Sequence, residues 1–172
     1  MSRISLLSPL AALALAASTT AVAGTSLGRD VIAEGVIPYD HYAAGASVDV
    51  DAQVLGDLVA AGGRVRVAGR IAGDLNAAGG DMEITADVDD DARLAGGRVR
   101  IDAHIRDHVV AAGGSVTLAP GSSVDGEVSV AGGEVVVAGR VRGPLRVTGG
   151  DVTLAGRIDG PVEVSARTLT LG

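Results

Sequence analysis

The sequence predicts an all-β fold: a single-stranded parallel β-helix of about seven coils, each with about 17 residues and three short strands. The first observation behind this prediction is a Gly-Gly pair that recurs with sequence separations of 17, 17, 17, 19 and 17. The pairs are Gly62-Gly63, Gly79-Gly80, Gly96-Gly97, Gly113-Gly114, Gly132-Gly133 and Gly149-Gly150. A fixed short period is typical of a solenoid, in which each unit stacks on the one before it. One step before the first pair lies Gly45-Ala46, so the repeat domain is expected to span residues 45–172.

The second observation is that apolar residues occupy fixed positions after each Gly-Gly pair. Runs such as Arg64-Val65-Arg66-Val67 alternate between polar and apolar residues, which indicates strands with one buried face. Small residues between these runs suit the corners of the coil. The predicted core ladder consists of Val65, Val67, Ile71, Leu75, Ile84, Val99, Ile101, Val137 and Leu154.

One interruption and one charge pattern refine this arrangement. Residues at equivalent positions of successive coils form a column. The interval of 19 predicts two extra residues near positions 119–123, after which Val124 and Val128 again occupy the positions of their columns. Outward positions alternate in charge from coil to coil, as at Arg64 and Asp81. Stacked strands lie about 4.8 Å apart, so opposite charges in neighbouring coils are expected to favour the correct register.

Composition narrows the possible functions. The 172 residues include 26 Gly but no Cys, Trp or Phe, which suits a narrow interior filled by aliphatic side chains. The absence of Cys excludes disulfides and cysteine metal sites. All 14 basic residues are Arg, they are interspersed with acidic residues, and the net charge is −7. We therefore expect no nucleic-acid partner.

The amino-terminal region is expected to be separate from the repeats. Arg3, an apolar run at residues 6–17 and Ala21-Val22-Ala23 predict a signal peptide over residues 1–23, cleaved after Ala23. A retained membrane anchor is the alternative, although the run is short for a bilayer span. The protein is therefore expected to be exported, to the periplasm or the extracytoplasmic face of the membrane. Residues 24–44 are interpreted as a lead-in that caps the first coil; a ligand site around Tyr39 and Tyr42 is the alternative.

Two classes of protein built on β-helices fit the columns poorly. Hexapeptide acyltransferases have a coil about one residue longer than the period here, and they need a catalytic His near a protruding loop. His104 and His108 fall in outward columns that carry Asp in the preceding coil, which predicts solvated His–Asp pairs. The calcium-binding nonapeptide roll requires a glycine at its fourth position, where these coils have a buried aliphatic residue.

A third class, the polysaccharide lyases, motivates the only candidate metal ligands. Asp57, Asp74 and Asp91 form a like-charged column, and stacked carboxylates can bind Ca²⁺. The coils lack aromatic residues for binding sugars, and Asp after Gly is common at corners. No nucleophile–base pair, phosphate loop or HExxH segment is present. We therefore expect no enzymatic activity and no cofactor, with these three aspartates as weak metal candidates.

Residues 45–172 resemble the bactofilins, the polymer-forming cytoskeletal family. The resemblance rests on the pattern V-x-G-x-(L/V)-x-A-G-G-x-V-x-(V/I), seen at residues 71–80 and again at 141–150. It implies a right-handed β-helix that assembles end to end into nonpolar filaments without nucleotide, and a scaffolding role. Typical members are cytoplasmic, so the predicted signal peptide implies an exported variant.

The expected function is a non-enzymatic structural scaffold of the cell envelope that self-associates through its coil ends. Its expected partners are further copies of itself and membrane or envelope components. The predicted ends are Val48 and Val50 on the first coil, and Leu169 and Leu171 on the last. Either the product continues beyond the last coil or this end meets another subunit. The alternative function is an exported carbohydrate-binding or carbohydrate-active β-helix that uses the acidic column.

Overall fold

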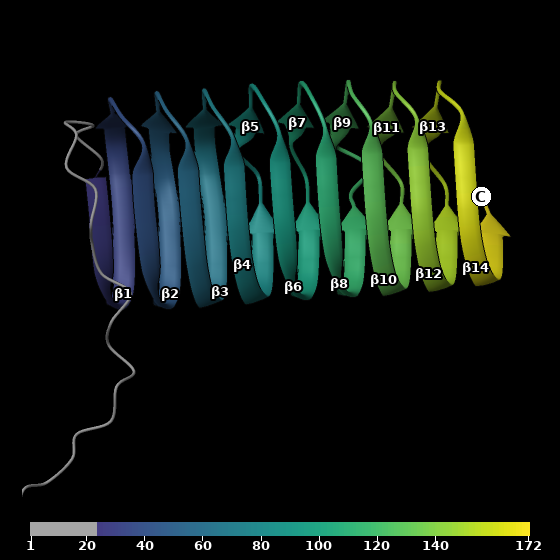
Figure 1. The fold of residues 1–172 in the computed structure, drawn as a ribbon, viewed down its shortest axis with the longest axis horizontal. Coiled ribbons are helices and arrows are strands. Elements are labelled where there is room, and N and C mark those ends of the chain that lie inside the picture. Colours follow the sequence, from purple (N-terminus) through teal and green to yellow (C-terminus); the bar gives the residue numbers. More distant parts are fainter. Residues whose placement is uncertain (1–23) are drawn as a thin grey trace, which may run out of the picture.

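The computed structural model describes residues 24–172, which form an all-β solenoid of about nine turns (Figure 1). The predicted signal peptide lies outside these residues. Within them, no helix is long and apolar enough to cross a membrane. The strands are β1 (Gly24–Ile37), β2 (His41–Val54), β3 (Leu58–Ile71), β4 (Leu75–Ile84), β5 (Asp87–Val88), β6 (Ala92–Ile101), β7 (His104–Ile105), β8 (Val109–Leu118), β9 (Ser123–Val124), β10 (Val128–Val137), β11 (Arg140–Val141), β12 (Leu145–Leu154), β13 (Arg157–Ile158) and β14 (Val162–Leu171).

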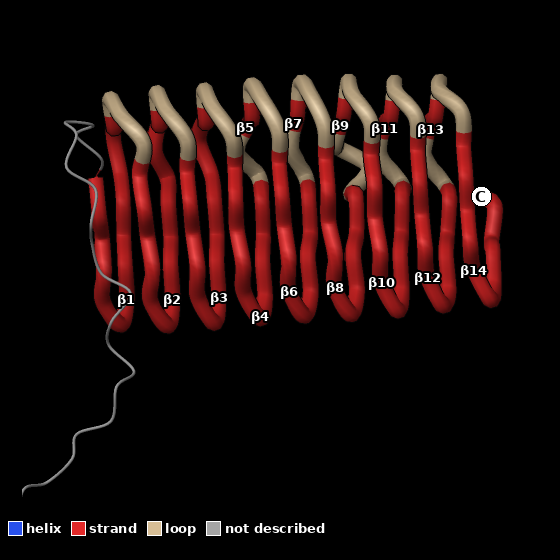
Figure 2. The backbone as a smooth tube through the Cα atoms, viewed as in Figure 1, coloured by secondary structure: helices blue, strands red, loops and turns tan. Residues whose placement is uncertain are grey.

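Each coil pairs in parallel with the next and keeps the register that the glycine period predicts. The residue numbers of Cα partners differ by 17, for example His41↔Leu58 and Leu75↔Ala92, except where β8 pairs with β10 and β7 with β9. From β4 to β12, each long strand bends at its Gly-Gly pair and supplies two sides of the coil, while a two-residue strand supplies the third (Figure 2). In β1, β2 and β3 all three sides form one strand of 14 residues. The predicted three-sided coil is confirmed.

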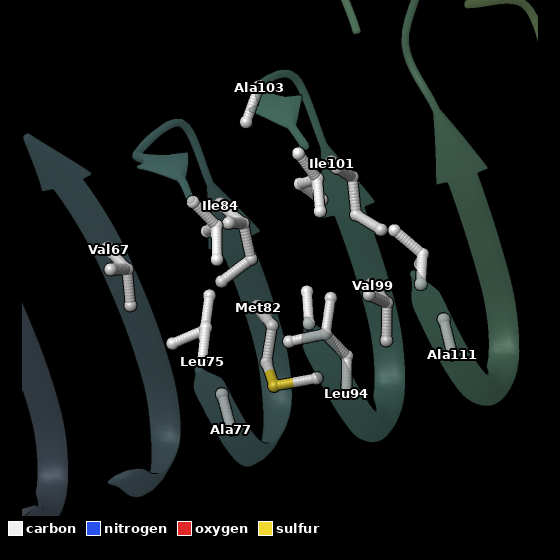
Figure 3. Packing of buried hydrophobic residues seen from close by; sticks show 14 of the residues in the cluster. Val67, Leu75, Ala77, Met82, Ile84, Leu94, Val99, Ile101, Ala103 and Ala111 are labelled. Carbon is white, nitrogen blue, oxygen red and sulfur yellow. The ribbon is translucent and has the colours of Figure 1, made fainter. Parts of the chain in front are cut away.

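The aliphatic columns form one continuous core along the axis (Figure 3). All nine residues of the predicted core ladder are buried, and the most exposed of them, Leu154, is only 8% exposed. Val67, for example, lies between Val50 and Ile84 in the same column. Burial of each such side chain contributes about 1.5–3 kcal/mol relative to exposure. The ladder is therefore the main source of stability, and it links neighbouring coils to one another.

The long interval is accommodated where the sequence predicts it. The register shifts from 17 to 19 between Leu118 and Ser123, and a tight turn takes up the two extra residues. The buried Ser122 hydroxyl donates a 2.7 Å hydrogen bond to the Ala119 carbonyl, and the Ser122 amide donates to the same oxygen at 2.9 Å. The buried polar groups of Ser122 are thus hydrogen-bonded within the turn. Beyond the turn the columns resume at Val124, which pairs with Ile105 and Val141.

Corners bring the backbones of consecutive coils into close approach, and glycine is required there. Gly69 has a φ of +90°, in the left-handed region that other residues rarely adopt. At Gly143 the conformation is ordinary, but a Cβ would fall 2.5 Å from the carbonyl carbon of Gly126. The corner glycines thus let coils stack at strand spacing.

Two predictions about the first coil are wrong. Residues 24–44 do not form a cap: β1 pairs with β2 along its length, and Val31 and Ala33 continue the inward columns. With the coil of β1 and the partial coil of β14 included, the stack has about nine turns, where the sequence predicts about seven. Val48 and Val50 consequently lie in the second coil, where they are 1% and 0% exposed, and they do not form an end.

Candidate functional site

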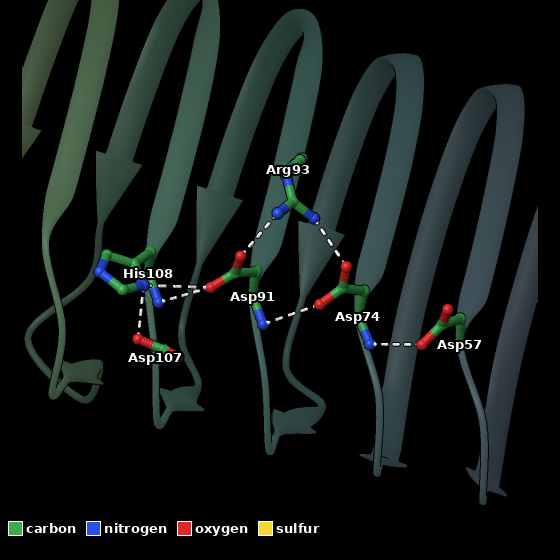
Figure 4. A network of polar contacts seen from close by, with 6 residues as sticks. All are labelled: Asp57, Asp74, Asp91, Arg93, Asp107 and His108. Atoms are coloured by element: carbon green, nitrogen blue, oxygen red, sulfur yellow. Dashed lines mark hydrogen bonds and ion pairs between the residues drawn. The ribbon is translucent and has the colours of Figure 1, made fainter.

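The acidic column at one corner forms a ladder of hydrogen bonds to the backbone (Figure 4). The Asp57 amide donates to Oδ1 of Asp40 at 3.0 Å, and the Asp74 amide donates to Oδ1 of Asp57 at 2.9 Å. The amides of Asp91 and His108 continue the series, at 3.2 Å to Asp74 and 3.0 Å to Asp91. Each carboxylate therefore fastens the corner of the following coil.

Arg93 occupies the remaining oxygens of two of these aspartates. One guanidinium nitrogen lies 2.7 Å from Oδ2 of Asp74, and the other lies 2.6 Å from Oδ2 of Asp91 (Figure 4). The hydrogen bond to Asp74, together with the nearby negative charges, raises the pKa of Arg93 above its usual value. Desolvation of its carboxyl group, and then the charges of Asp74 and Asp91, raise the pKa of Asp90 at the same corner. The cation thus offsets part of the repulsion within the column.

The three candidate metal ligands do not meet at a single point. Asp74 and Asp91 come within 4.8 Å of each other together with Asp90, and Asp91 also approaches Asp107 and His108. Asp57 belongs to neither group. Because both oxygens of Asp74 and Asp91 have partners in the chain, the column is explained by contacts that fasten the corners. We assign no metal to it.

Replacement of Asp74 by Ala tests this interpretation. A backbone hydrogen bond is worth about 1 kcal/mol, so the variant should lose about that much free energy of unfolding. The loss should be the same with added calcium and with a chelator, and neither should move the melting temperature of the unmodified protein. Denaturant unfolding followed by circular dichroism measures the free energy of unfolding, and thermal unfolding followed by the same signal measures the melting temperature. Stabilisation by calcium that disappears in the Asp74→Ala variant would establish a metal site instead.

His108 forms the predicted contact with Asp91, whereas the ring of His104 contacts Asp125 of the following coil and only the His104 backbone amide reaches Asp87. His108 Nδ1 lies 3.2 Å from Asp91 and also contacts Asp107. The backbone amide of His104 donates to Asp87 at 3.3 Å, and its Nε2 lies 3.3 Å from Asp125. Among residues 24–172 no serine or threonine hydroxyl is hydrogen-bonded to either ring. The arrangement is one of solvated pairs at corners.

Several short arginine–carboxylate contacts run diagonally between coils. Arg70–Asp89, Arg140–Asp159 and Arg146–Glu127 join residues 19 positions apart, at 2.6–2.8 Å. Among direct contacts between neighbouring coils, Arg66–Asp49 and Arg98–Asp81 are longer, at 3.9 and 3.6 Å, whereas Arg142–Asp125 is as short as the diagonal contacts, at 2.6 Å. Arginine is long enough to reach the diagonal neighbour in a sheet. The diagonal pairs therefore join a residue in one coil to a residue in the next coil that lies two positions away along the strand.

A shallow hollow of about 330 Å³ lies on the second side of the middle coils. Its charged lining consists of Arg64, Arg66, Asp81, Glu83, Arg98 and Arg100. Positive and negative side chains alternate from one coil to the next. The lining includes no hydroxyl, thiol or imidazole that could act as a nucleophile or base. The hollow therefore has the character of a charged surface.

The last coil exposes apolar residues that belong to the inward columns. Leu169 and Leu171 are 47% and 72% exposed, and Val162 on the same strand is about half exposed. β14 pairs with β12 on one side, and no described strand pairs with its other side. At the opposite end, β1 pairs only with β2 among the described strands, but its inward Val31 and Ala33 are buried. Of the predicted end residues, Leu169 and Leu171 are thus on an open edge.

Comparison of the chain with protein-family models, curated proteins and solved structures finds no match.

Proposed function

We propose that this protein is a non-enzymatic structural scaffold of the cell envelope that self-associates through the end of its solenoid. The observation that supports the proposal is the open β14 edge, where the inward apolar columns reach solvent. An unpaired strand edge offers amide and carbonyl groups to another strand, and large exposed apolar surfaces often mark interfaces. Both features occur on one strand, and a second copy of the chain provides a matching partner.

The charged surfaces support a structural role rather than a chemical one. The acidic column fastens corners, the histidines pair with aspartates, and the arginines bridge neighbouring coils. These groups have partners within the chain, which favours a rod-like scaffold over a carbohydrate-active site on the acidic column. Export and an envelope location belong to the same proposal and rest on the predicted signal sequence.

The double variant Leu169→Lys/Leu171→Lys tests the role of the β14 edge. Two charges on this edge should oppose burial against another chain, while the folded coils tolerate them because both side chains are solvent-exposed. We expect light scattering and electron microscopy to show assemblies of the unmodified chain and their loss in the variant. The matched control is Val110→Lys, at a half-exposed outward position on β8 in the middle of the stack, which should assemble normally.

The size of the species left after this change also reports the polarity of assembly. If coils associate head to tail, blocking β14 leaves monomers. If like ends associate, the same change leaves dimers joined through β1. The proposal would be contradicted if the unmodified chain were strictly monomeric at high concentration. It would also be contradicted if Val110→Lys reduced assembly as much as Leu169→Lys/Leu171→Lys does.

A further inference from the structure

A histidine occupies an apolar column of the core. His41 pairs in register with Leu58, and the next residue in that column is Leu75, so its side chain takes the place of an inward leucine. It is only 6% exposed. Among residues 24–172, neither ring nitrogen has a hydrogen-bond partner. A polar ring that is buried without partners costs free energy, so His41 differs from His104 and His108, which contact aspartates.

The first coil is shaped around this ring. Gly24 lies directly over His41 in the register of β1 and β2, and a Cβ on Gly24 would fall 2.6 Å from His41 Nδ1. The ring of Tyr39 lies close to the same point, 3.3 Å from it. The imidazole is thus enclosed by residues of the first coil, and this coil is held by a neighbouring described strand on one side only.

In the described part of the chain, no charged side chain forms a hydrogen bond or an ion pair with the ring. Leu58 lies below His41 in the register of β2 and β3, Gly24 lies above it, and the inward residues of β1 that are buried, Val31 and Ala33, are apolar. The nearest titratable groups along the chain and in the adjoining corners are Tyr39, Asp40, Tyr42 and Asp57. Both tyrosines are exposed, and the Asp40 carboxylate accepts the Asp57 amide instead of meeting the ring. Asp57 receives the His41 backbone amide through its carbonyl, and its carboxylate accepts the Asp74 amide.

We propose that His41 makes the first coil acid-sensitive: its protonation releases residues 24–40 from β2 and makes β2 the N-terminal edge of the stack. A positive charge on the ring has no counter-ion in its surroundings, whereas water solvates it once the coil opens. The end coil is also the unit that opens most easily, since terminal segments have the lowest local stability. Release uncovers Val48 and Val50, which are buried in the closed stack.

The direction of the pH dependence follows from burial. Burial lowers the pKa of His41 below its ordinary value of 6.5, because the interior disfavours the charged ring. The open coil therefore binds more protons than the closed coil below about pH 6.5. Closure is fully stable above that pH and weakens as the pH falls, until the pH reaches the lowered pKa. In this interval the opening equilibrium should rise up to tenfold for each pH unit.

Asp159, an acidic group with a shifted pKa, does not account for the same signature. Hydrogen bonds from Arg157 and Arg140 lower the pKa of Asp159 below its ordinary 3.8, so this group changes charge only in stronger acid. It also lies at the opposite end of the stack, on the coil of β12 and β13.

Hydrogen exchange of the 172-residue chain across pH 5–7.5, read by mass spectrometry after correction for the intrinsic rate, tests the proposal. We expect protection of residues 24–40 to fall as the pH decreases, by up to about tenfold per unit, while β6 and β8 stay protected. His41→Leu should remove this dependence, because leucine does not titrate and occupies the same column in the next two coils. His41→Gln, which is polar but does not titrate, separates loss of charge from gain of apolar packing and should also remove it. His108→Asn, at an exposed histidine, should leave it unchanged.

Exchange that is independent of pH in the unmodified chain, or unchanged by both His41 substitutions, would overturn the proposal. Any consequence for assembly rests on the proposed self-association and is measured separately by sedimentation of the same samples. Acid-induced opening together with His41-dependent association at low pH supports both ideas. Opening in Leu169→Lys/Leu171→Lys chains that remain monomeric at every pH supports the acid switch and contradicts association through the uncovered β2 edge.

Discussion

Replacement of Val67 by Asp is expected to prevent the stack from folding. Val67 is completely buried on β3, between Val50 and Ile84. An unpaired carboxylate there costs several kcal/mol, on the order of 3–5, or must be protonated. A domain of this kind has a total stability of about 5–15 kcal/mol, and a single coil cannot fold alone. Circular dichroism during denaturant unfolding should show no cooperative transition, or one at a much lower denaturant concentration.

The same substitution on the outer surface provides the control. Val110 lies on β8 and is half exposed, so Val110→Asp should change the free energy of unfolding by no more than about 0.5 kcal/mol. Equal destabilisation by the two aspartates would show that the inward and outward columns are wrongly assigned.

Deletion of one whole coil is expected to preserve the fold, although it removes a full repeat of the chain. Without residues 145–161, β14 follows the coil of β10 in the same register, so that Val128 faces Val162 and Val137 faces Leu171. The outward residues also remain compatible: Glu134 then faces Thr168 instead of Asp151. Because the stability of repeat proteins is approximately a sum over units and their interfaces, the variant should lose about one coil's share of stability and remain cooperative.

Deletion of residues 145–152 alone is the control for chain length. It removes about half as much of the chain but moves every later side chain out of its column and displaces the corners. We expect this shorter deletion to abolish the cooperative transition seen for the deletion of 145–161. If the shorter deletion were the better tolerated of the two, the register set by the glycine period would be contradicted.

The core could be predicted from the sequence because it depends on spacing alone. Strand alternation within a fixed repeat determines which face each aliphatic side chain occupies, and residues such as Ile71, Leu75 and Leu154 are all buried. The position of the two extra residues also follows from spacing, since the columns resume at Val124.

The first coil is hard to predict because its residues carry the pattern imperfectly. Gly28 is followed by Arg29 in place of a second glycine, and the apolar Ile32 and Val36 point outward, which obscures the alternation. His41 interrupts the leucine column, so the sequence suggests a cap where the chain continues to coil. The pairing of β1 with β2 shows that these residues form a coil. The pattern of side chains in the sequence does not reveal this pairing where the residues depart from the repeat.

The corner contacts could be placed only in part. Spacing puts Asp57, Asp74 and Asp91 in one column, but a column of like charges suggests a cation site or repulsion. The stabilising contacts depend on side-chain rotamers, which direct Oδ1 of each aspartate to an amide in the next coil and bring Arg93 between two of them. The burial of His41 likewise depends on the room left by Gly24.

The axial repeat of the assembled protein tests most directly the claim that a stack of coils joins end to end. Electron microscopy should give a regular repeat for assemblies of the unmodified chain. Assemblies of the variant without residues 145–161 should have a repeat that is shorter by one strand spacing, about 4.8 Å, for each chain along the axis. An unchanged repeat, or assemblies without axial order, would contradict end-to-end association of the solenoid.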